Sequence, residues 1–168
     1  MKKHFLGIGI VLLISAFLSS CLNSNTEEHT AALEMTDLQT YLQNLVSNGY
    51  DVDTTALGVY YVVMQEGTGD FPAAGDTISI KYVGYLMDGS IFDTSFYSSA
   101  DSTWTYVYKQ QQVLASWDEI TGLMNKGCKM EFIIPSSLAY GSTGAGIIPP
   151  YSSLIFVAIM QDIRKKAN

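Results

Sequence analysis

The segment from Thr77 to Leu86 alternates large apolar or aromatic residues with small or polar ones, and Asp88-Gly89 follows it directly. An alternation with a period of two residues is typical of a β-strand that buries one face. Asp-Gly is a preferred dipeptide in the tight turns that join antiparallel strands. Ile91-Phe92-Asp93 then supplies the partner strand. This hairpin pattern predicts an antiparallel sheet in the middle of the chain.

Further strand patterns and one helical pattern fill the chain after Gly58. β-Branched and aromatic residues predict strands at residues 59–64, 104–108, 129–134 and 154–163. Apolar residues at helical spacing predict one short helix between the second and third of these strands: Val113, Leu114, Trp117, Ile120, Leu123 and Met124. Antiparallel strands with a single internal helix indicate an α+β domain, which we place at residues 58–168.

The loop from Leu138 to Pro150 combines breakers of regular structure with large side chains. Three glycines and the Pro149-Pro150 pair exclude a helix or a regular strand. The loop nevertheless carries Tyr140 and the pair Ile147-Ile148. Such side chains indicate either a binding surface or a loop that closes the core.

The first 20 residues have the form of a secretory signal. Lys2 and Lys3 precede an apolar run that ends at Leu18, and small residues then lead to Cys21. The run is short for a membrane span, and its last residues with Cys21 resemble the lipobox of bacterial lipoproteins. That resemblance implies cleavage before Cys21 and lipidation of its thiol, which would hold the protein at a membrane surface. An uncleaved anchor and a soluble secreted product are the alternatives.

Residues 21–57 connect the signal to the domain. Residues 21–35 are polar and acidic and predict a flexible tether that starts at the lipidated Cys21. Thr36-Asp37-Leu38-Gln39 has the form of a capping box, and apolar residues keep helical spacing after it as far as Asn48-Gly49. We therefore expect an N-terminal helix and linker at residues 36–57. The apolar face of this helix is expected either to dock on the domain or to form a dimer with a second copy.

Charge and the scarcity of histidine and cysteine exclude several kinds of chemistry. Without the signal, the chain keeps seven basic and sixteen acidic residues, and this net charge of −9 argues against nucleic acid and anionic head groups as ligands.

The two histidines, His4 and His29, lie in the signal and the tether. A domain without histidine lacks the usual hydrolase relays and the preferred zinc ligands, so we expect neither a metal nor a cofactor. If Cys21 is lipidated, Cys128 cannot form an intramolecular disulfide, and we interpret it as an inert buried residue.

Several sequence blocks follow one another in a characteristic order. They are Gly75-Asp76, Tyr82-Val83-Gly84-Tyr85-Leu86 with Asp88-Gly89, Phe92-Asp93, Val113-Leu114 with Trp117, Ile134-Pro135 with Tyr140-Gly141, and Gly146-Ile147-Ile148-Pro149-Pro150 before Leu154-Ile155-Phe156. In this order they resemble the FKBP family of peptidyl-prolyl cis-trans isomerases. The resemblance extends from about Gly58 to Arg164. It implies an antiparallel β-sheet wrapped around one short α-helix, with an aromatic pocket between them.

The resemblance also assigns roles to individual residues. The backbone N–H of Ile148 and the hydroxyl of Tyr140 would fix substrate carbonyls, and Asp93 would act electrostatically beside the prolyl amide. Trp117 would form the floor of the pocket, and the other substrate-binding positions are Tyr82, Phe92, Trp104, Val113, Leu114 and Phe156. Without the resemblance, the aromatic residues would be interpreted as core, Asp93 as part of an Asx turn and Tyr140 as a loop anchor.

Some positions depart from the family pattern. Ala115-Ser116 precedes Trp117 where a glycine is common, Trp104 stands where many members carry phenylalanine, and a Ser/Tyr-rich insertion lengthens the loop after Asp93. The loop from Tyr140 to Ile147 is slightly shorter than in some members. These changes remove no pocket side chain, but they leave the substrate preference open.

Rotation about an X-Pro bond crosses a barrier of about 20 kcal/mol because it breaks amide resonance. A dry aromatic pocket withdraws water from the planar ground state and needs no nucleophile or metal. We therefore expect an isomerase that acts on proline-containing, unfolded or partly folded polypeptides in the bacterial envelope, on the periplasmic face of the outer membrane. The alternative is a non-catalytic peptide-binding chaperone or scaffold module. Hydrolysis by a carboxylate pair is disfavoured, because Asp93 has no obvious acidic partner close in sequence within the pocket blocks.

Overall fold

The computed structural model describes residues 29–167. Its elements, in chain order, are α1 (Ala31–Ser47), β1 (Asp53–Thr54), β2 (Tyr60–Gln65), β3 (Thr77–Tyr85), β4 (Ile91–Thr94), η1 (Ser95–Tyr97), β5 (Trp104–Val107), α2 (Ala115–Thr121), β6 (Lys129–Ile134), η2 (Ser136–Leu138) and β7 (Leu154–Arg164). The α+β class is confirmed, and each predicted strand appears within one residue of its expected position. The expected signal, Cys21 and the tether as far as residue 28 lie outside the described residues.

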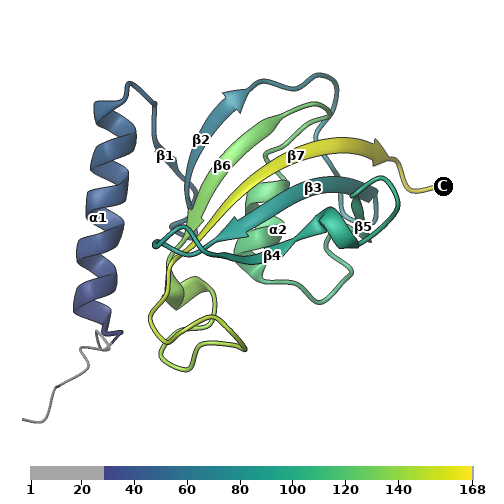
Figure 1. The fold of residues 1–168 in the computed structure, drawn as a ribbon. Coiled ribbons are helices and arrows are strands. Elements are labelled where there is room, and N and C mark those ends of the chain that lie inside the picture. The colour runs from purple at the N-terminus through teal and green to yellow at the C-terminus, as the bar shows by residue number, and fades with distance from the viewer. Residues whose placement is uncertain (1–28, 168) are drawn as a thin grey trace, which may run out of the picture.

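The seven strands form one antiparallel sheet that curves around α2 (Figure 1). The strand order is β1-β2-β6-β7-β3-β4, and β5 pairs with β3 beside this path. β3 changes partner along its length, since its first residues pair with β5 and its last residues pair with β4. The sheet wrapped around one short helix, as the FKBP resemblance implies, is therefore present.

The β3–β4 hairpin forms at the predicted Asp88-Gly89 turn. Gly89 has a φ of +84°, a backbone conformation that glycine adopts without the steric cost of a side chain. The Asp88 carboxylate accepts a hydrogen bond from the Ser90 backbone N–H at 2.8 Å, which closes the turn. The hairpin places Asp93 opposite Gly84 of β3.

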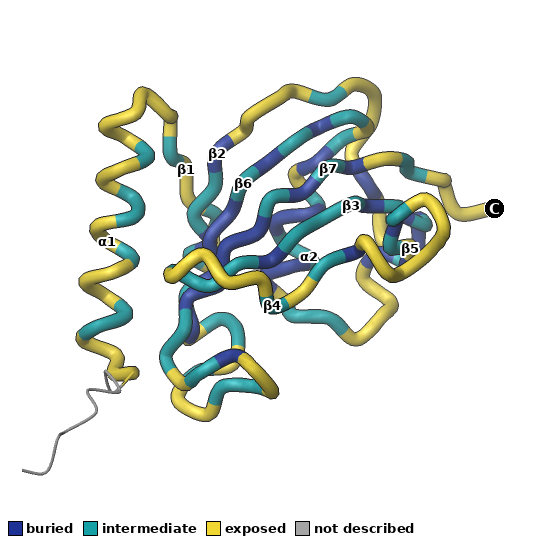
Figure 2. Tube along the Cα trace, viewed as in Figure 1, coloured by how far each residue is buried: buried dark blue, intermediate teal, exposed yellow. Residues whose placement is uncertain are grey.

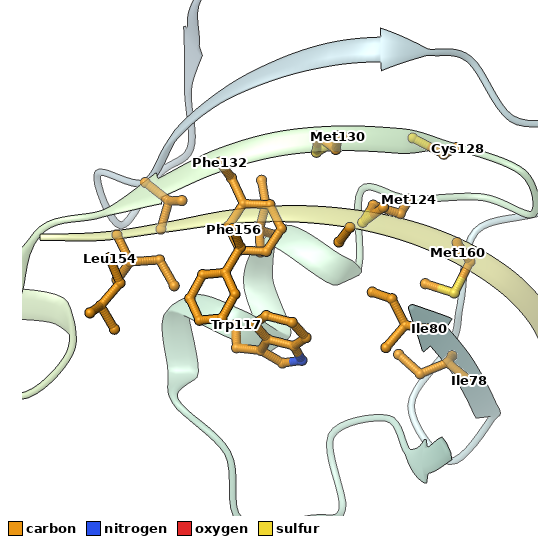
Figure 3. Packing of buried hydrophobic residues seen from close by; sticks show 14 of the residues in the cluster. Ile78, Ile80, Trp117, Met124, Cys128, Met130, Phe132, Leu154, Phe156 and Met160 are labelled. Carbon is orange, nitrogen blue, oxygen red and sulfur yellow. The ribbon is translucent and has the colours of Figure 1, made fainter. Parts of the chain in front are cut away.

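The core lies between α2 and the concave face of the sheet. Alternate residues of β7 point into it, namely Leu154, Phe156, Ala158 and Met160, as the period of two predicts. Trp117 of α2 packs over the ring of Phe156, and Ile78 and Ile80 of β3 extend the same cluster (Figure 3). Burial follows this layer across the sheet, whereas α1 and the loops are largely exposed (Figure 2). Each fully buried aliphatic side chain stabilises the fold by roughly 1.5–3 kcal/mol.

α1 begins at Ala31, ahead of the capping box predicted at Thr36. Thr30 is the N-cap, and its Oγ1 accepts a hydrogen bond from Leu33 N at 3.2 Å. Thr36 lies inside the helix, where its hydroxyl donates to the Ala32 carbonyl. The prediction that residues 31–35 belong to a flexible tether is wrong, because this stretch consists of good helix formers that directly follow a capping threonine.

α1 stands beside the sheet (Figure 1), and hydrogen bonds join it to the rest of the domain. None of the residues from Ala31 to Ser47 is buried. The Tyr41 hydroxyl donates to Glu131 Oε1 on β6 at 2.8 Å, and Glu34 accepts hydrogen bonds from Ser136 and Ser153. Of the two expected roles of this helix, docking on the domain is the one seen in the chain. The expected linker after it contains β1, a two-residue strand that the sequence did not reveal.

α2 ends at Thr121 and is therefore shorter than the helical pattern, which extends to Met124. Leu123 lies beyond the helix and is exposed, whereas Met124 turns back into the core. Cys128 is buried, as expected, and burial raises the pKa of its thiol to about 11. The thiol therefore stays protonated at neutral pH, which agrees with an inert residue. Among the described residues, no helix combines the length and the apolar character that crossing a membrane requires.

Candidate functional site

A small hollow opens between α2, the concave face of the sheet and two loops. Its volume is about 150 Å³, and it is lined by Tyr82, Asp93, Trp104, Val113, Leu114, Trp117, Tyr140 and Phe156. The structure thus brings together eight of the ten residues that the sequence assigned to the site. They come from β3, β4, β5, the start of α2, the loop after η2, and β7.

Aromatic rings build the floor and walls of this pocket. The ring centroid of Trp117 lies 4.9 Å from that of Phe156 and 5.1 Å from that of Tyr82, with the planes near perpendicular in both pairs. Trp104 stacks on Tyr106 with centroids 4.5 Å apart and meets the edge of Tyr82. The buried Trp117 Nε1 has no hydrogen-bond acceptor among the described residues, so aromatic packing holds the ring in place. Trp117, the predicted floor, is buried and is one of the residues that line the pocket.

Tyr82 and Asp93 form the polar side of the pocket. The Tyr82 hydroxyl donates to Asp93 Oδ2 at 2.9 Å, and the backbone N–H of Thr94 donates to Asp93 Oδ1 at 2.7 Å. Partial burial, assisted by the hydrogen bond to the nearby carboxylate, raises the pKa of Tyr82 well above its ordinary value. The phenol therefore remains a hydrogen-bond donor at physiological pH. The Tyr82 hydroxyl thereby orients Asp93.

Phe92, predicted as a substrate-binding residue, does not line the pocket. Its ring packs edge-on against the pocket residue Phe156, with centroids 5.3 Å apart. An added Cβ at Gly84 would lie 2.7 Å from the Phe92 ring, so the close approach of Phe92 to β3 depends on glycine. Phe92 therefore contacts a residue of the pocket wall without lining the pocket itself.

Ile148 also lies outside the pocket lining. Its backbone N–H donates to the Ala145 carbonyl at 2.9 Å, and the Ala145 N–H donates to the Ile148 carbonyl at the same distance. The side chain is buried in the core cluster. The loop is closed on itself at this point, so the amide predicted to hold a substrate carbonyl is occupied within the loop.

Leu114 offers a backbone donor in the same region. It is the N-cap residue of α2 and lines the pocket, and its own N–H donates to no group among the described residues. The first amides of a helix have no intrahelical acceptor, which leaves them available to a ligand. The sequence predicts Leu114 in the pocket only through its side chain.

Residues outside the pocket hold its two loops in position, and the sequence analysis missed them. Ser95 Oγ accepts from Tyr82 N at 2.9 Å and donates to the Ser102 carbonyl at 2.8 Å, which pins the loop after β4. Ser116 Oγ donates to the Leu138 carbonyl at 2.9 Å, which ties α2 to the Tyr140 loop. A single serine gives no sequence signal for such a contact, because its partner lies on another element of the chain.

Within residues 29–167, no group of three or more histidine, cysteine, aspartate or glutamate side chains is placed to hold a metal ion. The pocket combines one carboxylate, two phenols and a largely apolar surface. Such a site can position a neutral, partly apolar group and exclude water from it.

Comparison with known proteins agrees with this geometry. Residues 69–159 match the family model described as FKBP-type peptidyl-prolyl cis-trans isomerase. The chain is 40% identical over 116 residues to FkpA, an FKBP-type peptidyl-prolyl cis-trans isomerase of Aeromonas hydrophila, covering 69% of this chain and 42% of that protein. It is 36% identical over 113 residues to the FKBP-type 22 kDa isomerase of Escherichia coli, covering 67% of this chain and 53% of that one. The chain thus spans about half the length of these relatives.

Solved structures show the same fold. The crystal structure of FkpA from Escherichia coli superposes with a TM-score of 0.69 at 30% sequence identity, over 82% of this chain and 62% of that chain. A peptidyl-prolyl cis-trans isomerase from Pseudomonas syringae superposes with a TM-score of 0.65 at 27% identity, over 81% of this chain and 97% of the other. The family model covers β3 to the middle of β7, together with α2 and the loops between them. The chain therefore belongs to the FKBP-type peptidyl-prolyl cis-trans isomerase family.

Proposed function

We propose that this protein accelerates cis-trans rotation of X-Pro bonds in unfolded or partly folded polypeptides. The observation that carries the proposal is the pocket itself, in which Trp117, Tyr82, Phe156 and Trp104 surround a space of about 150 Å³ beside the carboxylate of Asp93. A pyrrolidine ring is small and apolar, and such a pocket buries it against aromatic faces. Family membership supports the same activity.

Catalysis on this proposal needs no covalent step. The planar amide carries partial charges that water solvates well, and burial of the prolyl group withdraws that solvation from the ground state. The twisted amide has less resonance and smaller partial charges, so it loses less solvation free energy when it moves from water into the pocket. The free-energy barrier to rotation therefore falls. A rate gain of 10³ to 10⁶ requires only about 4–8 kcal/mol, which desolvation and positioning can supply.

The residue roles follow from the geometry, with one change from the sequence prediction. The Tyr140 hydroxyl and the Leu114 N–H are the donors for substrate carbonyls, since the Ile148 N–H is held by Ala145. Asp93 lies beside the prolyl amide and is oriented by Tyr82. Val113 and Leu114 complete the apolar rim.

A protease-coupled assay with a proline tetrapeptide tests the proposal on the chain lacking residues 1–20. We expect catalysis well above the uncatalysed rate, and a loss of about tenfold or more in kcat/KM for Asp93→Ala and for Phe156→Ala. If wild type and both variants are no faster than the uncatalysed reaction while peptide still binds, the isomerase proposal fails.

The second candidate is a peptide-binding chaperone that uses the same pocket. Exposed apolar side chains favour it: Phe96 and Tyr97 are 62% and 86% exposed on the loop after Asp93, and Ile147 is 70% exposed on the Tyr140 loop. These residues would extend contact with an unfolded chain beyond the proline. Suppression of aggregation that is lost in Phe96→Ser/Tyr97→Ser, with kcat/KM for a tetrapeptide unchanged, would support this role. Equal suppression by the variant would exclude it.

The proposal includes a lipid anchor at Cys21 and a position in the bacterial cell envelope, at the periplasmic face of the outer membrane. The signal and lipobox patterns support it. Mass spectrometry of membrane-extracted protein should show an acylated Cys21 as the N-terminus. Membrane retention should be lost in Cys21→Ala, and an unmodified wild-type protein in the soluble fraction would contradict the anchor.

The proposal also includes a homodimer through exposed apolar residues of α1. Met35 and Val46 lie on one stripe of this helix and are 65% and 60% exposed. Light scattering coupled to gel filtration should give twice the monomer mass for wild type and the monomer mass for Met35→Glu/Val46→Glu. A monomeric wild type at high concentration would rule out the dimer.

A further inference from the structure

Glu34, in the first turns of α1, makes an unusual number of hydrogen bonds for a residue on a peripheral helix. Its Oε1 accepts from Ser136 N at 2.7 Å and from Ser153 Oγ at 2.6 Å, and its Oε2 accepts from Ser136 Oγ at 2.6 Å. Ser136 and Ser153 are 4% and 1% exposed. Short bonds from buried donors to a carboxylate are among the stronger hydrogen bonds in proteins.

The two serines lie at opposite ends of the loop that carries Tyr140. Ser136 opens η2, directly after β6, and Ser153 is the last residue before β7. One carboxylate therefore holds both ends of residues 136–153. Figure 1 shows this loop below the sheet, next to the first turn of α1.

The bonding continues from Ser136 to the residues on either side of Tyr140. The Ser136 carbonyl accepts from Ala139 N at 2.9 Å and from Gly141 N at 2.8 Å. The Gly141 carbonyl in turn accepts from Tyr151 N at 2.8 Å. A shift of Ser136 thus moves the backbone on both sides of Tyr140, whose side chain lines the pocket.

We propose that Glu34 is a positioning residue of the isomerase site: by bonding Ser136 and Ser153, it fixes the loop that presents the Tyr140 hydroxyl to the substrate. On this proposal, α1 contributes directly to the geometry of the isomerase site. This inference rests on the proposed function of Tyr140.

Removal of the Glu34 carboxylate should change the position of Tyr140 more than it changes the stability of the fold. Glu34→Ala leaves the Ser136 N–H and two buried hydroxyls without their acceptor, so the loop must rearrange or admit water. A catalytic group displaced by about 1 Å can cost up to about 100-fold in rate. We expect kcat/KM to fall at least about fivefold in Glu34→Ala, mainly through kcat, and to recover in part in Glu34→Gln, which keeps one oxygen acceptor.

Tyr41→Phe is the matched control. It removes the other hydrogen bond between α1 and the domain, from the Tyr41 hydroxyl to Glu131 Oε1, and leaves the loop contacts in place. We expect its kcat/KM to stay within about twofold of wild type. An equal loss in both variants would mean that docking of α1 in general matters, and would overturn the specific role of Glu34.

A double-mutant cycle separates positioning from general stability. If Glu34 acts through Tyr140, Glu34→Ala has little further effect on kcat/KM in the Tyr140→Phe background. The same loss in both backgrounds, or no loss in Glu34→Ala alone, would overturn the proposal.

Amide hydrogen exchange gives a readout that does not depend on turnover. The N–H groups of Gly141 and Tyr151 should exchange faster in Glu34→Ala and at the wild-type rate in Tyr41→Phe. Unchanged exchange in Glu34→Ala would overturn the loop-fixing role even in an active enzyme. Exchange could also be faster in Glu34→Ala while the wild-type protein shows no isomerase activity. In that case the proposed function fails, and Glu34 is not a positioning residue for catalysis.

Discussion

At the scale of single residues, the pocket depends on how a few polar atoms are oriented within an aromatic enclosure. Tyr82 contributes both to the aromatic enclosure and to the orientation of Asp93, because its ring packs on Trp117 while its hydroxyl donates to Asp93. Burial, with the neighbouring carboxylate, raises the pKa of Tyr82, so its proton stays in place across the physiological range. The orientation of Asp93 should therefore not change with pH through ionisation of Tyr82.

Tyr82→Phe isolates the contribution of that hydroxyl. The ring packing is kept and Asp93 loses one donor, so we expect kcat/KM to fall about two- to tenfold and the free energy of unfolding to change by about 1 kcal/mol or less. Tyr85→Phe on the same strand is the control, because its hydroxyl bonds no described residue and lies outside the pocket lining. Kinetics and urea denaturation measure both effects. An unaltered kcat/KM in Tyr82→Phe would show that the bond does not orient Asp93 for catalysis.

At the scale of elements, the loop between β6 and β7 is shaped by its glycines and by contacts from outside it. Gly144 has a φ of +68°, and an added Cβ would come within 2.8 Å of the Pro149 carbonyl carbon. This crowding arises because the loop folds back so that Ala145 and Ile148 bond each other. The same fold-back removes the Ile148 amide from the pocket.

Gly144→Ala should disturb this loop more than Gly146→Ala does. Both positions have a positive φ, but an added Cβ at Gly146 meets no atom within 4 Å. We expect a loss of unfolding free energy of about 1 kcal/mol for Gly146→Ala, from backbone strain alone, and a loss at least about twice as large for Gly144→Ala. Thermal or chemical denaturation of the two variants measures the difference. Equal losses would mean that the loop relaxes around the new methyl group.

At the scale of the whole molecule, Asp76 joins segments that are far apart in the chain. This buried carboxylate accepts from Ala73 N at 2.8 Å and from Lys166 N at 2.9 Å, and Lys165 Nζ lies 3.3 Å away. The two backbone donors, followed by the lysine, lower the pKa of Asp76. The residue thereby fastens the C-terminal end of β7 to the start of β3.

Asp76 should make the fold sensitive to acid. Because its pKa is lower in the folded state, its contribution is complete above the unfolded pKa and is lost as the pH falls through the folded pKa. Urea midpoints measured from pH 7 down to about pH 2 should therefore decline at the acid end for wild type and decline less for Asp76→Asn, which should be less stable at pH 7. Parallel pH profiles for the two proteins would contradict this role.

Much of the fold could be predicted from local patterns, because each pattern reports a local constraint. Alternation fixed the strands, Asp88-Gly89 fixed the hairpin, and helical spacing located α2. The start of α1 was misjudged because Thr36 has the form of a cap, whereas Thr30 makes the capping bond. The good helix formers that follow Thr30 carry the helix back to that threonine, so Thr36 lies inside it.

The sequence by itself determined the sheet, the internal helix and most of the pocket side chains, since each of these depends on residue type and spacing. Only the tertiary structure decided which backbone amides are free, that Phe92 packs on Phe156 without lining the pocket, and that Glu34 reaches the Tyr140 loop. The contacts of Glu34 join residues separated by 102 and 119 positions. Contacts between such distant residues leave no periodic trace, because they are set by how the sheet curves and where the chain returns.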